Sequence, residues 1–239
     1  MNDDFYIGYR KTAPARLARF VATAAAVICA VVVSVSIVIG RMQQEAGNGN
    51  YEFGNPATVE GTVRTVPILH IEIEETGRAA LLVGDGKHGA SDAIADAANS
   101  RIQLTATRIE RDGTLMLETT GEVEILDAPT RNSPNRTDAG TEVSLAGELV
   151  DSKCYLGVMN PGRGKVHRGC AAECLRGGVP PALLVRTHDG QSHVIALVPA
   201  DTAPSVDPEW AARNVEVSGV LTNLEGFGVL TYEHIALAN

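Results

Sequence analysis

The side chains best suited to site chemistry lie in one short stretch, CYLGVMNPGRGKVHRGCAAEC, residues 154–174. It contains three of the chain's four cysteines, Cys154, Cys170 and Cys174, together with His167. If HRGCAAECLRGG forms a helix, His167, Cys170 and Cys174 stand at positions i, i+3 and i+7 and share one face. Cys154 can then fold back over that face. The spacing therefore predicts that three sulfurs and one imidazole converge.

Two chemistries would make direct use of such a convergence. A set of Cys154, His167, Cys170 and Cys174 suits tetrahedral zinc, and the soft thiolates would also suit copper(I) or iron in a cluster. Alternatively, Cys154 could form a disulfide with Cys170 or Cys174 and leave one thiol over, which would suit an oxidising compartment. A Cys170–Cys174 bond is disfavoured because cysteines one helical turn apart must strain to meet disulfide geometry.

Two further interpretations stay open. A redox or covalently reactive thiol would be favoured by a supporting basic loop, in which cations stabilise a thiolate at Cys154 or Cys170. This loop consists of Lys153, Arg163, Lys165 and Arg168. The cysteines could also be thiols that only pack in a small core. No C-x-x-C-H is present for c-type haem attachment. The residues do not identify a cofactor, although they could bind zinc or copper.

The chain gives no pattern of a catalytic centre. It has no G-x-S-x-G elbow, and no pair of carboxylates is spaced for acid–base work. We therefore expect no catalytic residues, and a binding protein rather than an enzyme.

An apolar stretch near the N-terminus predicts the compartment. Residues 20–40, FVATAAAVICAVVVSVSIVIG, carry no charge and are long enough to cross a bilayer as one helix. Arg10, Lys11, Arg16 and Arg19 precede it, and only Arg41 follows before Arg64. The positive-inside rule then predicts a cytoplasmic tail at 1–19 and an extracytoplasmic, periplasmic remainder in a single-pass protein of the inner cell membrane.

Composition limits the rest of the chain. Of its 239 residues 44% are hydrophobic but only 4% are aromatic, so the core must be aliphatic and rich in β-branched residues, which favours strands. The formal charge of −9 argues against nucleic-acid binding, which needs basic surface.

Two strand-rich halves follow the apolar stretch. Linkers are predicted at 41–56 and 127–141 from their Gly, Asn and Pro content, which leaves domains at 57–126 and 142–239. Runs such as ILHIEIEE alternate with period two, and Arg-Asp-Gly joins the last two runs of the first half as a hairpin. Only the second half has an insertion, the Cys/His segment at 151–178, between its first two strands.

The halves also resemble each other. NSRIQLTATRIERDGTLMLE aligns without gaps on NVEVSGVLTNLEGFGVLTYE, from Asn99 on Asn214 to Glu118 on Glu233. About five short strands with a helix before the last hairpin suggest an OB-fold. The predicted fold is mainly β: one transmembrane helix followed by two tandem OB-like barrels. The alternative is one continuous β-sandwich.

The Cys/His segment resembles a motif of uncharacterised bacterial membrane-anchored or exported proteins. Its pattern is D-x-K-C-Y, then H-x-x-C-A-x-x-C, then G-x-P. The matching residues here are Asp151, Lys153, Cys154, Tyr155, His167, Cys170, Ala171, Cys174, Gly178 and Pro180. The resemblance covers about 35 residues and implies a site without naming a reaction.

A second resemblance is one of architecture, to the periplasmic haem chaperone of cytochrome c maturation, which is also an anchored OB barrel. That family holds haem through an H-x-x-x-Y histidine, whereas Tyr232 precedes His234 here. The order argues against haem. We therefore expect a membrane-anchored envelope protein whose Cys/His insertion binds a metal, a redox cofactor or an envelope protein partner. The alternatives are an accessory or thiol-redox protein of an envelope electron-transfer system, and a disulfide-stapled scaffold.

Overall fold

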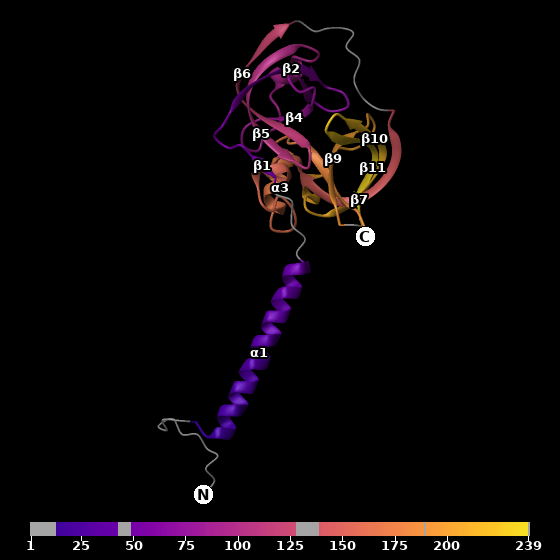
Figure 1. Ribbon diagram of the computed structural model, residues 1–239. Coiled ribbons are helices and arrows are strands. Elements are labelled where there is room, and N and C mark those ends of the chain that lie inside the picture. Colours follow the sequence, from indigo (N-terminus) through magenta and orange to yellow (C-terminus); the bar gives the residue numbers. More distant parts are fainter. Residues whose placement is uncertain (1–12, 43–48, 128–138, 189, 239) are drawn as a thin grey trace. The chain divides into compact units, whose positions relative to one another are not determined.

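The computed structural model describes residues 13–42, 49–127, 139–188 and 190–238 (Figure 1). Of the predicted segments, most of the 1–19 tail, part of the 41–56 linker and most of the 127–141 linker lie outside these residues. The chain divides into two compact units, Met1–Glu45 and Ala46–Asn239. The second unit contains both strand-rich halves.

The first unit has one helix, α1 (Ala15–Met42), whose Ala15–Gly40 segment has a mean hydropathy of 2.7 and is 0% buried. It is long and apolar enough to cross a membrane. The predicted apolar helix is therefore present and longer than the uncharged stretch 20–40. Cys29 is exposed on it.

The first half is a mainly antiparallel sheet in the strand order β1-β5-β2-β3-β4-β6, in which β5 also pairs with β6. Only β4 and β6 run parallel. Its elements are β1 (Asn50–Tyr51), β2 (Ala57–Arg64), β3 (His70–Ile73), β4 (Ala79–Val83), α2 (Asp92–Asp96), β5 (Arg101–Arg111) and β6 (Thr114–Asp127).

The second half is a closed barrel in the order β10-β11-β9-β8-β7. Again one strand pair, β9 with β11, is parallel. The elements are β7 (Thr141–Asp151), the one-turn helix η1 (Cys154–Val158), α3 (Arg168–Arg176), β8 (Pro181–Arg186), β9 (Ser192–Pro199), η2 (Pro208–Trp210), β10 (Asn214–Leu224) and β11 (Phe227–Leu237). Strand for strand, β7 to β11 repeat the pairings among β2 to β6.

The register of the strands corrects the predicted alignment of the halves. Gly61 of β2 pairs with Ile102, and Gly147 of β7 pairs with Val215. The gapless alignment instead matches Val215 with Ser100, two residues away from Ile102. A slip of two leaves the alternation of inward and outward side chains unchanged, so the hydrophobic pattern cannot detect it.

The two paired glycines occupy equivalent tight places. A Cβ added to Gly61 would lie 2.4 Å from the Glu72 carbonyl oxygen, and one added to Gly147 would lie 2.5 Å from that of Leu184. Each half therefore needs glycine where its first strand crosses the second. This shared requirement supports the corrected equivalence.

Three apolar clusters form most of the core. One lies within the first half around Ile71, and one within the second around Leu149. The third is shared: Val83 and Met116 of the first half pack in it with Cys154 and Cys174 of the second. The cysteines therefore lie where the two halves meet.

Candidate metal centre

The cysteines are carried by a segment that leaves the barrel at Asp151 and returns at Pro181, between β7 and β8. It begins with η1 and continues to α3, which starts after His167 and ends before Gly177. Gly178 has a φ of 89°, the left-handed conformation that commonly ends a helix. The predicted helix and its glycine end are therefore present, whereas η1 was not predicted.

The sulfur atoms of Cys154, Cys170 and Cys174 all lie within 4.8 Å of one another. The Sγ atoms of Cys154 and Cys174 are 4.0 Å apart. Both of these side chains are buried, and Cys170 is half-buried. The insertion thus brings its three thiols together.

These distances do not describe a disulfide. All four cysteines of the chain lie among the described residues, and all are free. A disulfide needs its sulfurs about 2.05 Å apart, so the predicted bond from Cys154 is not formed. Sulfurs held about 2.3 Å from one ion would lie about 3.8 Å apart in a tetrahedral site and about 4.0 Å apart in a trigonal one. The 4.0 Å spacing of Cys154 and Cys174 is close to both values.

His167 belongs to a different group from Cys170 and Cys174. Its Nε2 lies 3.0 Å from Oδ2 of Asp151, and both residues are buried. Asp151, His167 and Cys154 form a second triad whose ligand atoms lie within 4.8 Å. The four residues predicted as one set are therefore divided between two triads that share Cys154.

Asp151 connects these two triads. Its Oδ1 accepts a hydrogen bond from the Cys154 backbone N–H at 2.8 Å, while Oδ2 faces His167. This carboxylate fixes the first turn after β7 and holds His167 at the start of α3. It is thus a brace between the two helical pieces of the insertion.

The contact between the two buried sulfurs shifts their pKa values in opposite directions. The hydrogen bond to Cys174, burial and the nearby Asp151 charge all raise the pKa of Cys154. The hydrogen bond from Cys154 lowers the pKa of Cys174 against the opposing effect of burial, with a smaller contribution from Lys87. Of the two thiols, Cys174 therefore loses its proton more readily.

Lys87, in the glycine-rich turn 84–91 of the first half, is the cation beside the sulfurs. Desolvation lowers its pKa, but the adjacent Cys170 and Cys174 sulfurs outweigh this, and its pKa lies above the usual value. In the basic loop, Arg168 donates to the Ala212 carbonyl at 3.4 Å and Lys165 is exposed. Arg163 is half-buried.

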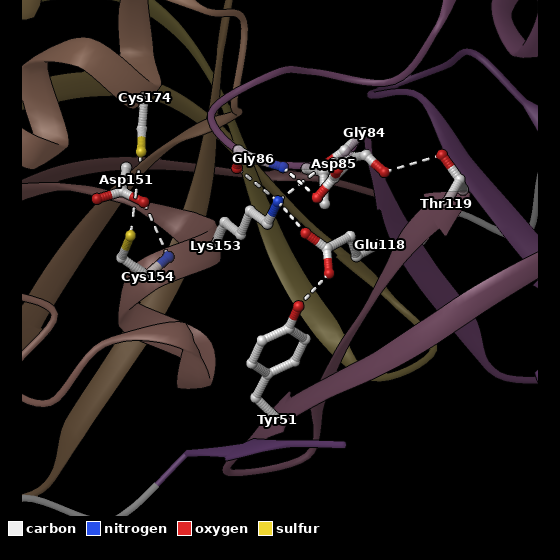
Figure 2. A network of polar contacts seen from close by, with 11 residues as sticks. Tyr51, Gly84, Asp85, Gly86, Glu118, Thr119, Asp151, Lys153, Cys154 and Cys174 are labelled. Atoms are coloured by element: carbon white, nitrogen blue, oxygen red, sulfur yellow. Dashed lines mark hydrogen bonds and ion pairs between the residues drawn. The ribbon is translucent and has the colours of Figure 1, made fainter. Parts of the chain in front are cut away.

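Lys153, the fourth member of that basic loop, is buried and points into the first half (Figure 2). Its Nζ donates to the carbonyl oxygens of Gly84 and Gly86 at 2.8 and 2.7 Å, and it pairs with Oε1 of Glu118 at 2.5 Å. Three acceptors thus satisfy all three donors of the ammonium. Tyr51 donates to the other Glu118 oxygen, and burial, the hydrogen bond and the Glu118 charge raise its pKa.

The next residue of the motif also contacts the first half. The guanidinium of Arg111 lies 4.5 Å from the centre of the Tyr155 ring, a cation–π contact. Each residue of Asp151, Lys153, Cys154 and Tyr155 thus has a separate contact. Together they fasten the insertion internally and to the first half.

Sequence reasoning missed Tyr51, Lys87 and Glu118. Tyr51 falls in the predicted 41–56 linker, where the structure has β1, and Lys87 lies in a glycine-rich turn with no pattern that predicts a site. Of these three residues, only Glu118 has a sequence context that predicts a buried polar contact. It ends TLMLE, a run that is buried throughout in the structure, and a carboxylate in such a run needs a partner.

Searches of family models, curated proteins and solved structures find no match for this chain.

Proposed function

We propose that the three-sulfur cluster binds one soft metal ion, copper(I) or zinc, in a membrane-anchored protein with no catalytic role. The mutual approach of Cys154, Cys170 and Cys174 within 4.8 Å carries this proposal. Three thiolates without a fourth ligand in the same group favour copper(I), which accepts low coordination by soft sulfur. Zinc would need a fourth ligand, for which water or a shift of His167 is available.

The surroundings of the cluster support a bound ion there. The hydrogen bond from Cys154 lowers the pKa of the Cys174 thiol, which favours exchange of its proton for an ion. Burial of the sulfurs in the shared apolar cluster would exclude water and oxidant from a bound ion. Half-buried Cys170 provides the side from which an ion could enter.

The setting proposed for this site is the outer side of an inner membrane. The apolar α1 and the basic residues before it support an N-terminus in the cytoplasm and a periplasmic body. In each half the strand order and the parallel pair of third and fifth strands support an OB-like barrel. The partner expected here is an envelope protein that supplies or accepts the ion.

A thiol-redox role is the second candidate, because Cys154 and Cys174 are close and one of them has a lowered pKa. Their burial opposes it, since exchange requires a substrate disulfide to reach the attacking sulfur. Cys170, the more accessible thiol, would have to act first.

Metal analysis with thiol counting tests the proposal. Full-length Cys29→Ser chain is purified reduced in detergent, stripped of metal, and loaded with zinc or with copper(I) in an oxygen-free buffer. We expect one ion per chain and protection of three thiols from alkylation. Retention of no ion, with three reactive thiols, would exclude the metal function. Loss of two thiols without metal would support the disulfide or redox alternatives instead.

A further inference from the structure

Cys154 directly follows Lys153, whose side chain reaches into the first half. Lys153 pairs with Glu118, which accepts a hydrogen bond from Tyr51, and Figure 2 shows this network beside the Cys154 and Cys174 sulfurs. We propose that these three residues are a latch that positions Cys154, so that metal occupancy and the docking of the first half are coupled. The metal part of this inference rests on the proposed function.

The latch joins three separate parts of the chain. Tyr51 comes from β1, Glu118 from β6, and Lys153 from the turn that begins the insertion. The side chains of Lys153 and Glu118 are 2% and 6% exposed, so water cannot readily replace either partner. A buried charge that loses its partner is strongly destabilising. Loss of either Lys153 or Glu118 should therefore open the latch, whereas loss of the Tyr51 hydroxyl should only weaken it.

The backbone around Cys154 leaves little room for independent motion. A Cβ added to Gly49 would lie 1.9 Å from the Leu156 carbonyl oxygen, and one added to Gly157 would lie 2.8 Å from that of Asn50. Gly49 and β1 thus pack directly on η1, the turn that begins at Cys154. Displacement of β1 or of the first half would move this turn.

The second face of the insertion is fixed to the first half as well. The Gly89 N–H donates to the Gly177 carbonyl at 2.8 Å, just after α3. The turn 84–91 therefore contacts Lys153 at one end and the residues after Cys174 at the other. An ion that holds Cys154 and Cys174 at one distance would stabilise both contacts, and the contacts would in turn favour the ion.

The test compares a buried and an exposed ion pair in the full-length Cys29→Ser chain in detergent. Glu118→Gln and Lys153→Met disrupt the latch, and Tyr51→Phe removes only its outer hydrogen bond. Glu60→Gln is the control, because it breaks the exposed Glu60–Arg101 pair of the same half, 2.6 Å long. We expect about a tenfold loss of zinc or copper(I) affinity in the first two variants, a smaller loss in Tyr51→Phe, and none in the control.

A metal-free readout separates this inference from the proposed function. Alkylation of Cys154 in the apo chain, followed by mass spectrometry, should be about tenfold faster in Glu118→Gln and Lys153→Met. Amide exchange in β10 and β11 should stay at the wild-type rate, which general unfolding would not allow. The latch is wrong if Cys154 in these variants is alkylated at the wild-type rate. It is also wrong if amide exchange in β10 and β11 becomes faster together with the alkylation.

A double variant separates positioning from stability. Lys153→Met with Glu118→Leu replaces a buried ion pair by apolar side chains, which commonly restores stability. We expect a recovered melting temperature with Cys154 labelling still fast, because Gly84 and Gly86 are no longer held. If the melting temperature and the slow alkylation of Cys154 both return to their wild-type values, these residues have a role in stability alone. If the wild-type chain binds neither ion, the proposed function fails and the labelling result alone decides the latch. If it binds an ion with unaltered affinity in both latch variants, the coupling is wrong.

Discussion

The two halves of the body share their strand pairings but differ in the link between their first two strands. In the first half, β2 passes to β3 through residues 65–69 alone. In the second, the link between β7 and β8 carries η1, α3 and all three clustered cysteines. The difference shows that the cysteine cluster lies on a connection, while the strands that support it are paired alike in both halves.

The first half nevertheless completes the site of the second. Its link after β4, residues 84–91, supplies Lys87 to the sulfurs and backbone carbonyls to Lys153. The corresponding link after β9 leads to η2, whose Glu209 pairs with Arg176 of α3. The insertion thus contacts equivalent links of both halves.

The largest effect on the difference between the two halves is expected when one sulfur of the cysteine cluster is removed. Cys174→Ser should lower zinc or copper(I) affinity by at least about a hundredfold, because loss of a ligand exceeds loss of a neighbour that orients one. Competition titration against a coloured chelator measures this. Cys29→Ser, which alters the exposed cysteine of α1, is the matched control and should bind as wild type. Equal affinity of the two variants would mean that the cluster holds no ion.

The equivalence of the halves predicts equal damage at equivalent glycines. Gly61→Ala and Gly147→Ala should each destabilise the body by about 3 kcal/mol, since the new Cβ meets a carbonyl oxygen of the neighbouring strand. Urea unfolding of the full chain reports the loss. Gly169→Ala, in α3 with open space around it, should be neutral or up to about 1 kcal/mol stabilising. A tolerated change at only one of the two glycines would contradict the equivalence.

Substitution of His167 tests whether its side chain only holds Asp151 in place or itself binds the metal ion. His167→Ala leaves buried Asp151 with one partner fewer, and we expect a loss of about 2 kcal/mol in the apo chain, measured by urea unfolding. Metal affinity should fall by about tenfold through displacement of Cys154. A stable apo chain that loses all metal binding would instead make His167 a fourth ligand.

The smallest expected effect is on the pH dependence of folding stability in the first half. Burial lowers the pKa of His70, partly offset by its contact with the Ile68 carbonyl. Because the folded pKa lies below the unfolded value of about 6.5, stability is complete above that pH and is lost as pH falls, when only the unfolded chain binds the proton. Urea midpoints at about pH 7.5 and about pH 5.5 should therefore differ less in His70→Gln than in wild type. His234→Gln, at an exposed position, should keep the wild-type difference.

Much of the architecture could be predicted because alternation and turn residues are local. The strands, the Arg111–Thr114 hairpin, the apolar helix and the glycine end of α3 all follow from short-range patterns. The convergence of the cysteines followed from helical spacing. The pairing register did not, since a shift of two residues preserves every inward-facing position.

The partners of the motif could not be predicted, because they come from segments distant in sequence. A lysine between a strand and a loop normally reaches solvent, so the sequence predicts that Lys153 belongs to a basic loop that favours a thiolate. Its burial depends on Glu118 and on carbonyls of Gly84 and Gly86, 67 to 69 residues away for the carbonyls. Only the packing of one half on the other brings these groups together.

The short distance between the two ends of the insertion has a consequence for engineering this segment. Asp151 and Pro181 are cross-strand partners in the β7–β8 ladder, so their Cα atoms lie about 5 Å apart. A barrel of this kind closes in the same way whether 29 residues or a tight turn spans that gap. The strand ladder therefore closes without the segment, whereas the packing of the two halves depends on it, because its removal would leave the buried Glu118 without Lys153. The close spacing of its ends makes the segment a candidate for transplantation into other small barrels, provided that the recipient offers a carboxylate and carbonyls where Lys153 emerges.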